Sequence, residues 1–381
     1  GELSKFYPNT MMETGHDLLD RWTARMIMLG LYVTDTVPFK NVYLHGMVLD
    51  EHGQKMSKSK GNVINPMEII AEYGSDALRM GVVAARSAGQ NQAFSMAKVV
   101  AGRNFCNKLW NIARYIEDKV GDAYQSRGAN PQTIADHWVV QQLNQAADEI
   151  AQHLADHRFA EAAEVVYHTI WDAVADWYIE ASKKQDNPDM LAWVLETSLK
   201  LAHPFAPFVT ETIWETLAWE EALLINARWP EQEKFDAIAA GEFTQLQKLV
   251  AEARFVASEL PGGRQTLLYE NDALIADNTA LIAHLAKLAA VEHIEKPQGL
   301  RLAVPNREAW LKIDEETLYE HQTKLELRIA ETRTFINNLQ GRLANEGYVK
   351  NAPEKIVAET RQQLAEQQSL LERLEHELSV L

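Results

Sequence analysis

Much of the chain carries the hydrophobic spacing that is typical of α-helices. Residues 91–240 are almost entirely helical in pattern, and a proline-containing segment, His203–Phe208, interrupts them. The candidate helices cover about 95–120, 134–155, 158–183, 189–202 and 207–218. Large aromatic anchors for a helix bundle are Trp110, Trp138, Trp171, Trp177, Trp193 and Trp214. We therefore predict a helical bundle over residues 91–240.

Residues 1–90 alternate strand and helix patterns. Phe6–Met12 predicts a short strand, Gly15–Asp17 predicts a turn, and the apolar spacing that follows predicts a helix from about Leu18 to Leu31. Asp17 is a candidate N-cap of that helix. A helix N-terminus favours a phosphate or a hydroxyl-rich ligand, because its amide groups and dipole attract negative charge. We predict an α/β segment with a ligand near this turn.

Two further helices are predicted after residue 64. Asn65-Pro66 starts one helix that continues through Tyr73, and Gly74–Arg79 begins the next. Asp76 lies near the start of the second helix. Two roles for Asp76 remain open at this point: a helix cap, or a brace for the loop that precedes these helices.

Residues 241–313 change character. A helix at about 242–258 is followed by a break at Pro261-Gly262-Gly263. The patterns after the break have the order β-α-β-β. This order predicts a small α+β module with an antiparallel sheet.

Residues 314–381 carry two heptad seams. Apolar residues recur at alternating three- and four-residue spacing from Leu318 to Leu343 and again from Val357 to Leu381. The segment Asn345–Pro353 breaks the pattern between the seams. We predict two helices that form an antiparallel coiled-coil hairpin, and a chain that is mainly α with a partial α/β fold at its start.

Composition narrows the possible functions. The chain has 381 residues, 46% of them hydrophobic, with a net charge of −17 and a pI near 5.2. Any contact with nucleic acid must therefore rest on local basic patches. A single cysteine, Cys106, excludes a disulfide framework and a cysteine-rich zinc site, and we predict no metal site. No apolar run is long enough to span a membrane, and no signal peptide is visible. We expect a cytoplasmic chain that starts inside a longer protein, since residue 1 is not Met.

The most distinctive stretch is Gln54–Val63, which we call the lysine loop. Three lysines and two serines alternate in it, and Gly61 and Asn62 close it. Asp50–Gly53 predicts a turn before it, and apolar residues flank it on both sides. Lysine ammonium groups would act as point charges on phosphate oxygens, and hydroxyl and backbone N–H groups would add hydrogen bonds. A Lys/Ser-rich loop is more often a solvated turn, but here the pattern indicates a polyphosphate site.

The string Lys55-Met56-Ser57-Lys58-Ser59 resembles the signature loop of class I aminoacyl-tRNA synthetases, and the similarity extends to Pro66. Glu13–Asp17 with Trp22, and Val37–Gly46, resemble the valyl-tRNA synthetases within that class. The resemblance implies that Lys55, Met56, Ser57, Lys58 and Ser59 bind ATP, used with Mg²⁺. It also implies that Lys55 and Lys58 are catalytic and stabilise phosphate charge, with Lys58 as the main transition-state contact.

The same resemblance assigns the amino-acid site. It implies that Thr14, Gly15 and Asp17 line the aminoacyl-adenylate and that Trp22 lies beside the amino-acid side chain. Many relatives carry aromatic residues just before this tryptophan, whereas this chain has Leu19-Asp20-Arg21. The fine shape of the valine pocket is therefore left open.

The helical parts resemble tRNA-binding regions of the family. Phe105–Asn111 resembles the first helix of the anticodon-binding bundle, which implies tRNA contacts by Arg103, Lys108 and Asn111. From spacing alone these residues form a solvated helix face. The break in the hairpin resembles the loop of the C-terminal tRNA-binding arm at Asn345, Glu346, Tyr348, Val349, Ala352 and Pro353. We expect Tyr348 and Lys350 to contact tRNA, while a dimer contact by the hairpin remains the alternative.

We interpret the chain as a C-terminal portion of a bacterial valyl-tRNA synthetase, with valine and tRNA(Val) as partners and a monomer expected. The expected domains are a catalytic portion (1–90), an anticodon-binding bundle (91–240), a linker module (241–313) and a coiled-coil arm (314–381). No His-x-Gly-His string and no editing domain are visible, so we expect the chain alone to be inactive. The alternatives are an isoleucyl- or leucyl-type synthetase, a non-catalytic tRNA-binding protein, and a coiled-coil scaffold.

Overall fold

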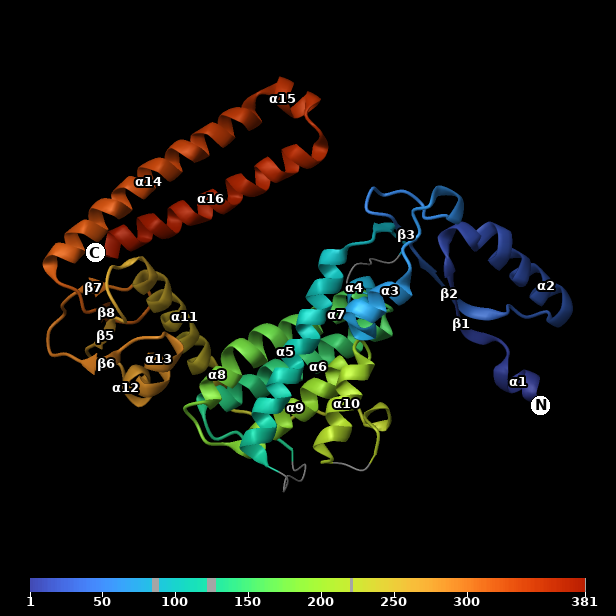
Figure 1. Cartoon of the computed structure of the whole chain (residues 1–381), viewed down its shortest axis with the longest axis horizontal. Helices are drawn as coiled ribbons and strands as arrows, with labels where there is room; N and C mark the ends of the chain where they lie inside the picture. Colours follow the sequence, from blue (N-terminus) through green and yellow to red (C-terminus); the bar gives the residue numbers. More distant parts are fainter. Residues whose placement is uncertain (84–88, 122–127, 220–221, 381) are drawn as a thin grey trace. The chain divides into compact units, whose positions relative to one another are not determined.

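The computed structural model describes residues 1–83, 89–121, 128–219 and 222–380 (Figure 1). These residues form two compact units, Gly1–Ala240 and Gly241–Leu381. Most of the described residues are helical and the sheets are small. The prediction of a mainly α chain with a partial α/β fold is therefore confirmed. None of the described helices is both long enough and apolar enough to cross a membrane.

The first unit begins with a β-α-β segment. Helix α1 (Glu2–Phe6) precedes strand β1 (Asn9–Gly15), which runs parallel to β2 (Phe39–His45). A parallel pair needs a crossover, and helix α2 (Ala24–Thr34) supplies it. The predicted strand at Phe6–Met12 was therefore placed a few residues too early. The outer side of α2 is apolar and exposed, with Tyr32 at 89%, Val33 at 74% and Met28 at 69%.

The prediction that Asp17 caps the helix after β1 is wrong. A 3₁₀ turn, η1 (His16–Leu18), and a π-helical turn, η2 (Leu19–Thr23), separate β1 from α2. Gly15 occupies the cap position of η1, and Thr23 occupies that of α2 without a side-chain cap. Asp17 lies inside the first turn, too far before Ala24 to reach the amide groups of α2. Its carboxylate is therefore free to face another segment.

The lysine loop lies between the two strands of a second short parallel pair. Strand β3 (Val48–Leu49) pairs with β4 (Gln92–Ala93), and a 3₁₀ turn, η3 (Lys58–Lys60), lies within the loop. Helix α3 (Pro66–Tyr73) starts as predicted, with Asn65 Oδ1 accepting a hydrogen bond from Met67 N at 3.1 Å. Helix α4 (Ser75–Val83) comes next.

The helical bundle of the first unit matches the predicted helices closely. Its elements are α5 (Met96–Val120), α6 (Ile134–Ala155), α7 (Phe159–His168), the π-helical η4 (Thr169–Tyr178), α8 (Ile179–Ser182), α9 (Pro188–Ala202), α10 (Pro207–Leu217) and the 3₁₀ turn η5 (Leu224–Asn226). Almost every residue of α9 is buried, so the core lies around this helix. The predicted anchors divide: Trp138, Trp193 and Trp214 are buried, whereas Trp110 is exposed.

The second unit contains most of α11 (Ala237–Glu259), whose first residues belong to the first unit, and a mixed sheet. Its strands are β5 (Thr266–Tyr269), β6 (Ala290–His293), β7 (Leu300–Arg301) and β8 (Ala309–Leu311), in the order β6-β5-β8-β7. Helices α12 (Ala273–Asp277) and α13 (Thr279–Leu285) connect β5 to β6. The prediction of an antiparallel sheet is wrong for this pair, because a helical crossover returns the chain parallel to β5. The pairs β5–β8 and β7–β8 are antiparallel.

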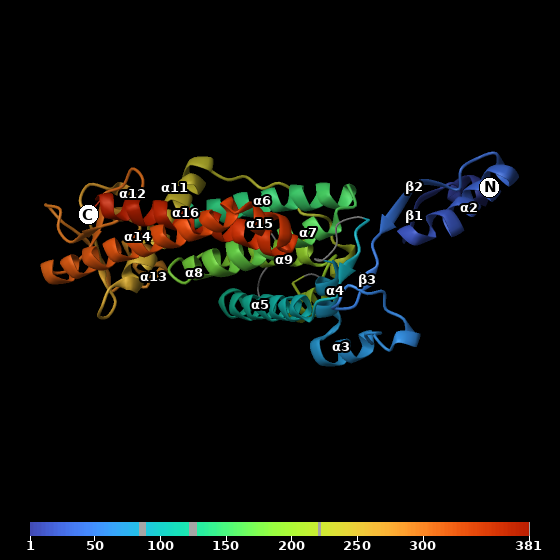
Figure 2. The ribbon, with the colours of Figure 1, turned by 90° about the horizontal axis from the view of Figure 1, so that it is seen from above.

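The predicted coiled-coil hairpin is present. Helices α14 (Glu315–Ala344) and α16 (Glu354–Val380) lie side by side, and the short α15 (Glu346–Asn351) occupies the break between them (Figures 1 and 2). Leu325 and Ile329 pack against Leu374 in the seam. Burial of this seam explains why the heptad pattern alone predicted the pair.

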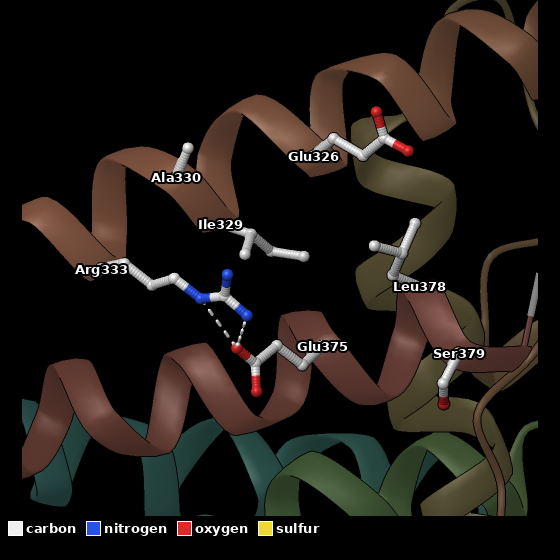
Figure 3. Close-up of a pocket in the computed structure, with 7 residues that line it drawn as sticks. All are labelled: Glu326, Ile329, Ala330, Arg333, Glu375, Leu378 and Ser379. Carbon is white, nitrogen blue, oxygen red and sulfur yellow. Dashed lines mark hydrogen bonds and ion pairs between the residues drawn. The ribbon is translucent and has the colours of Figure 1, made fainter.

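Charged pairs attach the hairpin to the rest of its unit. Arg328 binds Glu259, and Arg373 Nη2 lies 3.0 Å from Glu252 Oε2, so both helices are tied to α11. Between the two helices, at the end away from α15, Arg333 reaches Glu375 across a groove of about 390 Å³ (Figure 3). The groove is lined by Glu326, Ile329, Ala330, Arg333, Glu375, Leu378 and Ser379.

Candidate functional site

The carboxyl end of β1 forms one side of the candidate site. Thr14 and Gly15 are buried there, directly opposite Leu44 and His45 of β2. The Nε2 atom of His45 lies 3.3 Å from Glu13 Oε1. A Cβ atom at Gly15 would stand 2.8 Å from Asp17 Oδ1, so a side chain here would displace that carboxylate. The carboxyl ends of parallel strands are where α/β folds bind nucleotides.

Lys55 and Asp17 bring the lysine loop to this strand end. Lys55 Nζ lies 3.5 Å from Asp17 Oδ2, although the two residues are far apart in the sequence. Both side chains are largely exposed, and such a pair contributes about 0–1 kcal/mol to stability. The contact therefore contributes little to the stability of the fold, and its main effect is on the position of the Lys55 side chain.

Asp50 and Asn62 close the neck of the lysine loop. Asp50 is buried, and its Oδ1 accepts hydrogen bonds from the backbone N–H groups of His52 and Gln54. Its Oδ2 accepts a hydrogen bond from Asn62 Nδ2 at 2.8 Å. The bond from Asn62 is the main reason why the pKa of Asp50 lies below its ordinary value, and the backbone donor at Gln54 adds to it. The carboxylate therefore stays ionised at neutral pH.

The centre of the lysine loop presents cationic and hydroxyl groups to solvent. Lys58 begins η3, and Gly61 ends it with a φ of 66°, a conformation that glycine adopts without strain. The hydroxyls of Ser57 and Ser59 lie 3.2 Å apart, and Met56 is half-buried beside them. Within the described ranges, the Lys58 ammonium group makes no hydrogen bond or ion pair. An unpaired ammonium group beside exposed hydroxyl groups can bind a phosphate group.

Trp22 lies on the π-helical turn η2 and is 56% exposed. It forms no hydrogen bond and no ring contact with another residue of the described part of the chain. Leu19, Asp20 and Arg21, which depart from the family pattern, are exposed on the same turn. An indole in this position is free to contact a ligand.

Asp76 and Arg79 attach helix α4 to the helical bundle. Asp76 is buried and accepts hydrogen bonds from the backbone N–H groups of Phe208 and Val209, at 3.2 and 2.6 Å. Arg79 donates to the carbonyl oxygens of Pro204 and Phe205 at 3.1 and 3.3 Å. Asp76 is therefore a cap, but of α10 rather than of its own helix.

The predicted tRNA-binding residues on α5 differ in their surroundings. Arg103 and Asn111 are exposed, and the Arg103 guanidinium lies 5.5 Å from the ring centre of Tyr73. Lys108 is engaged within the bundle: its Nζ lies 3.0 Å from Asp176 Oδ1 and 5.1 Å from the ring centre of Trp171. Arg103 and Asn111 are thus open to a phosphate, whereas Lys108 would first have to leave Asp176.

The predicted tRNA-binding residues of the arm lie on α15. The Tyr348 hydroxyl is 2.8 Å from Thr360 Oγ1 on α16, and its ring is half-buried. Tyr348 therefore closes the tip of the hairpin instead of standing free. Lys350 belongs to α15, but its side chain lies outside the described side chains.

Sequence reasoning gave no role to Asn62 and did not identify the partner of Asp76. Asn62 had one available signal: it follows Gly61 near the end of the lysine loop, and Asp50 lies in the turn just before the loop. No local sequence signal could have identified the partners of Asp76, because they lie 132 and 133 residues further along the chain. In the described part of the chain, no group of three His, Cys, Asp or Glu side chains is placed to hold a metal ion.

Three sequence families match this chain in order. Residues 1–95 match tRNA synthetases class I (I, L, M and V), residues 136–261 match the anticodon-binding domain of tRNA ligase, and residues 318–381 match the valyl tRNA synthetase tRNA binding arm. The chain belongs to the valyl-tRNA synthetase family. Membership of this family explains why the lysine loop, a helical bundle and a coiled-coil hairpin occur together in one chain.

Individual relatives agree with this family. The valine–tRNA ligase of Thermotoga maritima is 33% identical over 98% of this chain, and that of Geobacillus kaustophilus is 32% identical over 94%. The match covers 45% and 44% of those proteins, so the chain spans less than half of their length. A solved ternary complex of Agrobacterium radiobacter LeuRS with tRNA and LeuAMS covers 70% of this chain and 32% of its own, with a TM-score of 0.53 and 20% identity. That likeness shows a shared fold.

Proposed function

We propose that the chain forms part of a valine–tRNA ligase. In the proposed reaction, the valine carboxylate attacks the α-phosphorus of ATP and pyrophosphate leaves. Valine then passes from the adenylate to the 3′ end of tRNA(Val). Valine, ATP with Mg²⁺ and tRNA(Val) are the proposed partners, and the cytoplasm, where tRNA is charged for translation, is the proposed compartment.

One observation carries this proposal: an exposed, unpaired Lys58 lies in the same loop as Lys55, which meets Asp17 at the end of a parallel strand. Charge on the transferring phosphate group needs cations that are already in place when the reaction occurs. Lys58 would contact that charge first, and Lys55 would contact the departing phosphates. Met56, Ser57 and Ser59 would complete the ATP site through backbone and hydroxyl groups.

The remaining assignments extend from this site. Thr14 and Gly15 would line the adenylate because they end β1, and Asp17 would join them because it contacts Lys55 of the lysine loop from the turn that follows. The free indole of Trp22 would lie against the valine side chain. Residues 1–90 would act as the catalytic portion, 91–240 as the anticodon-binding bundle, 241–313 as a linker and 314–381 as the tRNA-binding arm. Of the three predicted tRNA-binding residues on α5, Arg103 and Asn111 remain available for phosphate contacts.

The test is Lys58→Ala in a valine–tRNA ligase of full family length that carries this segment. We expect valine-dependent ATP–pyrophosphate exchange to fall by about 10²–10³-fold, because one transition-state contact is lost. Lys60→Ala is the matched control, since Lys60 is an exposed lysine in the same 3₁₀ turn but outside the signature string. We expect the control to lose less than about tenfold. A folded Lys58→Ala enzyme with wild-type exchange would refute the assignment.

A further inference from the structure

Asn62 uses both functional ends of its side chain to close the lysine loop. Its Oδ1 accepts a hydrogen bond from Ser57 N at 2.9 Å. Its Nδ2 donates to Asp50 Oδ2 at 2.8 Å and to the carbonyl oxygen of Lys55 at 3.3 Å. One amide thereby joins Asp50, in the turn before the loop, to two points of the loop backbone.

Asp50 is built to receive this bond. Its carboxylate also accepts the N–H groups of His52 and Gln54, and its own N–H donates to the Gln54 carbonyl at 2.8 Å. Leu49 and Lys55 form a β-bridge next to it. Asp50 is therefore fixed from several directions, and Asn62 attaches the far end of the loop to a rigid point. We call this pair the Asp50–Asn62 latch.

The latch acts on the two lysines through the backbone. The bond to Ser57 N fixes the residue before Lys58, and the bond to the Lys55 carbonyl fixes Lys55 itself. Without these bonds, the β-bridge to Leu49 would still hold the Lys55 backbone, but its side chain would keep only the exposed 3.5 Å contact with Asp17 among the described residues. A misplacement of about 1 Å can cost about 10²-fold in rate, so a backbone restraint at this point has a large effect on catalysis.

We propose that Asn62 is a positioning residue for the reaction: together with Asp50 it holds the lysine loop in the form in which Lys55 and Lys58 meet the phosphates of ATP. The proposal rests on the proposed function and adds a specific residue to it. Asn62 itself would touch neither ATP nor valine. The amide is essential because it must accept from Ser57 N and donate to Asp50 at the same time, which neither an ionised carboxylate nor an apolar side chain can do.

Exchange of the two side chains gives a rescue test. In Asn62→Asp, two carboxylates that can only accept hydrogen bonds face each other. In Asp50→Asn, two NH₂ groups that can only donate face each other. The double variant Asp50→Asn/Asn62→Asp restores one donor opposite one acceptor. It also keeps an acceptor oxygen for Ser57 N and another for the N–H groups of His52 and Gln54. Only the 3.3 Å bond to the Lys55 carbonyl is lost. Asn65→Asp is the charge control: it keeps the oxygen that caps α3 and adds the same charge nearby, and it loses only an exposed bond to Glu68 outside the loop.

The first readout is trypsin cleavage after the three lysines of the loop, measured on this chain by mass spectrometry. We expect each single variant to be cut about ten to a hundred times faster than wild type, because cleavage follows the population of the open loop. The double variant should return to within a few-fold of wild type, and Asn65→Asp should match wild type. Circular dichroism checks that every variant is folded. Wild-type cleavage of Asn62→Asp would overturn the latch.

The second readout is pyrophosphate exchange in the full-length ligase. We expect Asn62→Asp to lower kcat or raise the KM for ATP by about 10–10²-fold with the KM for valine unchanged, and the double variant to recover most of the loss. If Lys58→Ala is inactive while Asn62→Asp is fully active, the positioning role is overturned and the proposed function stands. If Lys58→Ala is fully active, the proposed function is overturned together with the catalytic role of the latch. The cleavage rates report on the latch independently of catalysis, so they distinguish failure of the latch from failure of the proposed function.

Discussion

Asp76→Ala should weaken the attachment of helix α10 to helix α4, which Arg79 would still hold through the carbonyl groups before α10. Helix α10 starts with Pro207, which has no N–H, and its cap residue Ala206 has no side-chain acceptor. The first two free amide groups are therefore those of Phe208 and Val209, and Asp76 accepts from both. Truncation of Asp76, which is itself buried, leaves these two donors without their carboxylate partner.

The magnitude follows from these contacts. A hydrogen bond to a charged group contributes about 1.5–3 kcal/mol. A carboxylate at a helix N-terminus adds about 0.3–1 kcal/mol. The two bonds share one carboxylate and are not additive, so we expect a loss of about 3 kcal/mol. For a unit of this size that corresponds to a fall in Tm of roughly 6–12 °C.

Urea unfolding followed by tryptophan fluorescence measures this loss, because the bundle contains most of the tryptophans. Asp76→Asn is the matched control: it keeps one acceptor oxygen but no charge, and should lose about 1–2 kcal/mol. A loss below about 0.5 kcal/mol for Asp76→Ala, the range of an ordinary surface substitution, would show that Asp76 is not the cap of α10.

Three further predictions concern other parts of the chain. Burial, together with the nearby Asp76 carboxylate, raises the pKa of Cys106 to about 12, so the thiolate is scarce at pH 8. Labelling by a disulfide reagent should be about 10³-fold slower in the native protein than in urea, and rapid native labelling would contradict this. Replacing the tip of the hairpin, residues 337–366, by a short glycine–serine link should weaken tRNA binding about tenfold and flatten its salt dependence. An unchanged affinity with a halved mass in sedimentation would instead identify a dimer contact. Tyr348→Phe removes the bond to Thr360 and should increase hydrogen exchange at the tip, with a loss of about 1 kcal/mol; unchanged exchange rates would show that the bond does not hold the tip.

Periodic patterns predicted the elements that bury a continuous stripe. The hairpin is the clearest case, since Leu325, Ile329 and Leu374 are seam positions and are all buried. The bundle helices were predicted for the same reason. Irregular turns carry no periodic signal, and therefore the 3₁₀ and π-helical turns after β1 were read as one helix. Because of that error, Asp17 was predicted to be a helix cap, whereas it lies within η1.

Contacts between distant segments could not be predicted from spacing. The string of the lysine loop indicated a phosphate site, but it did not show that Lys55 meets Asp17 or that Lys58 is unpaired. The role of Asn62 depends on the direction of one side-chain amide in a closed loop. The direction of the sheet in the second unit likewise depended on whether the helices between β5 and β6 form a crossover.

The exposed apolar side of α2 has a consequence for the colloidal behaviour of the protein in solution. Tyr32, Val33 and Met28 form a surface on which copies of the chain can adhere to one another. The net charge of −17 opposes such adhesion by repulsion between copies. Added salt shortens the range of that repulsion to about 8 Å at 0.15 M and leaves the apolar attraction intact. Concentrated stocks are therefore best kept at low ionic strength, and salt titrations are best run on dilute samples.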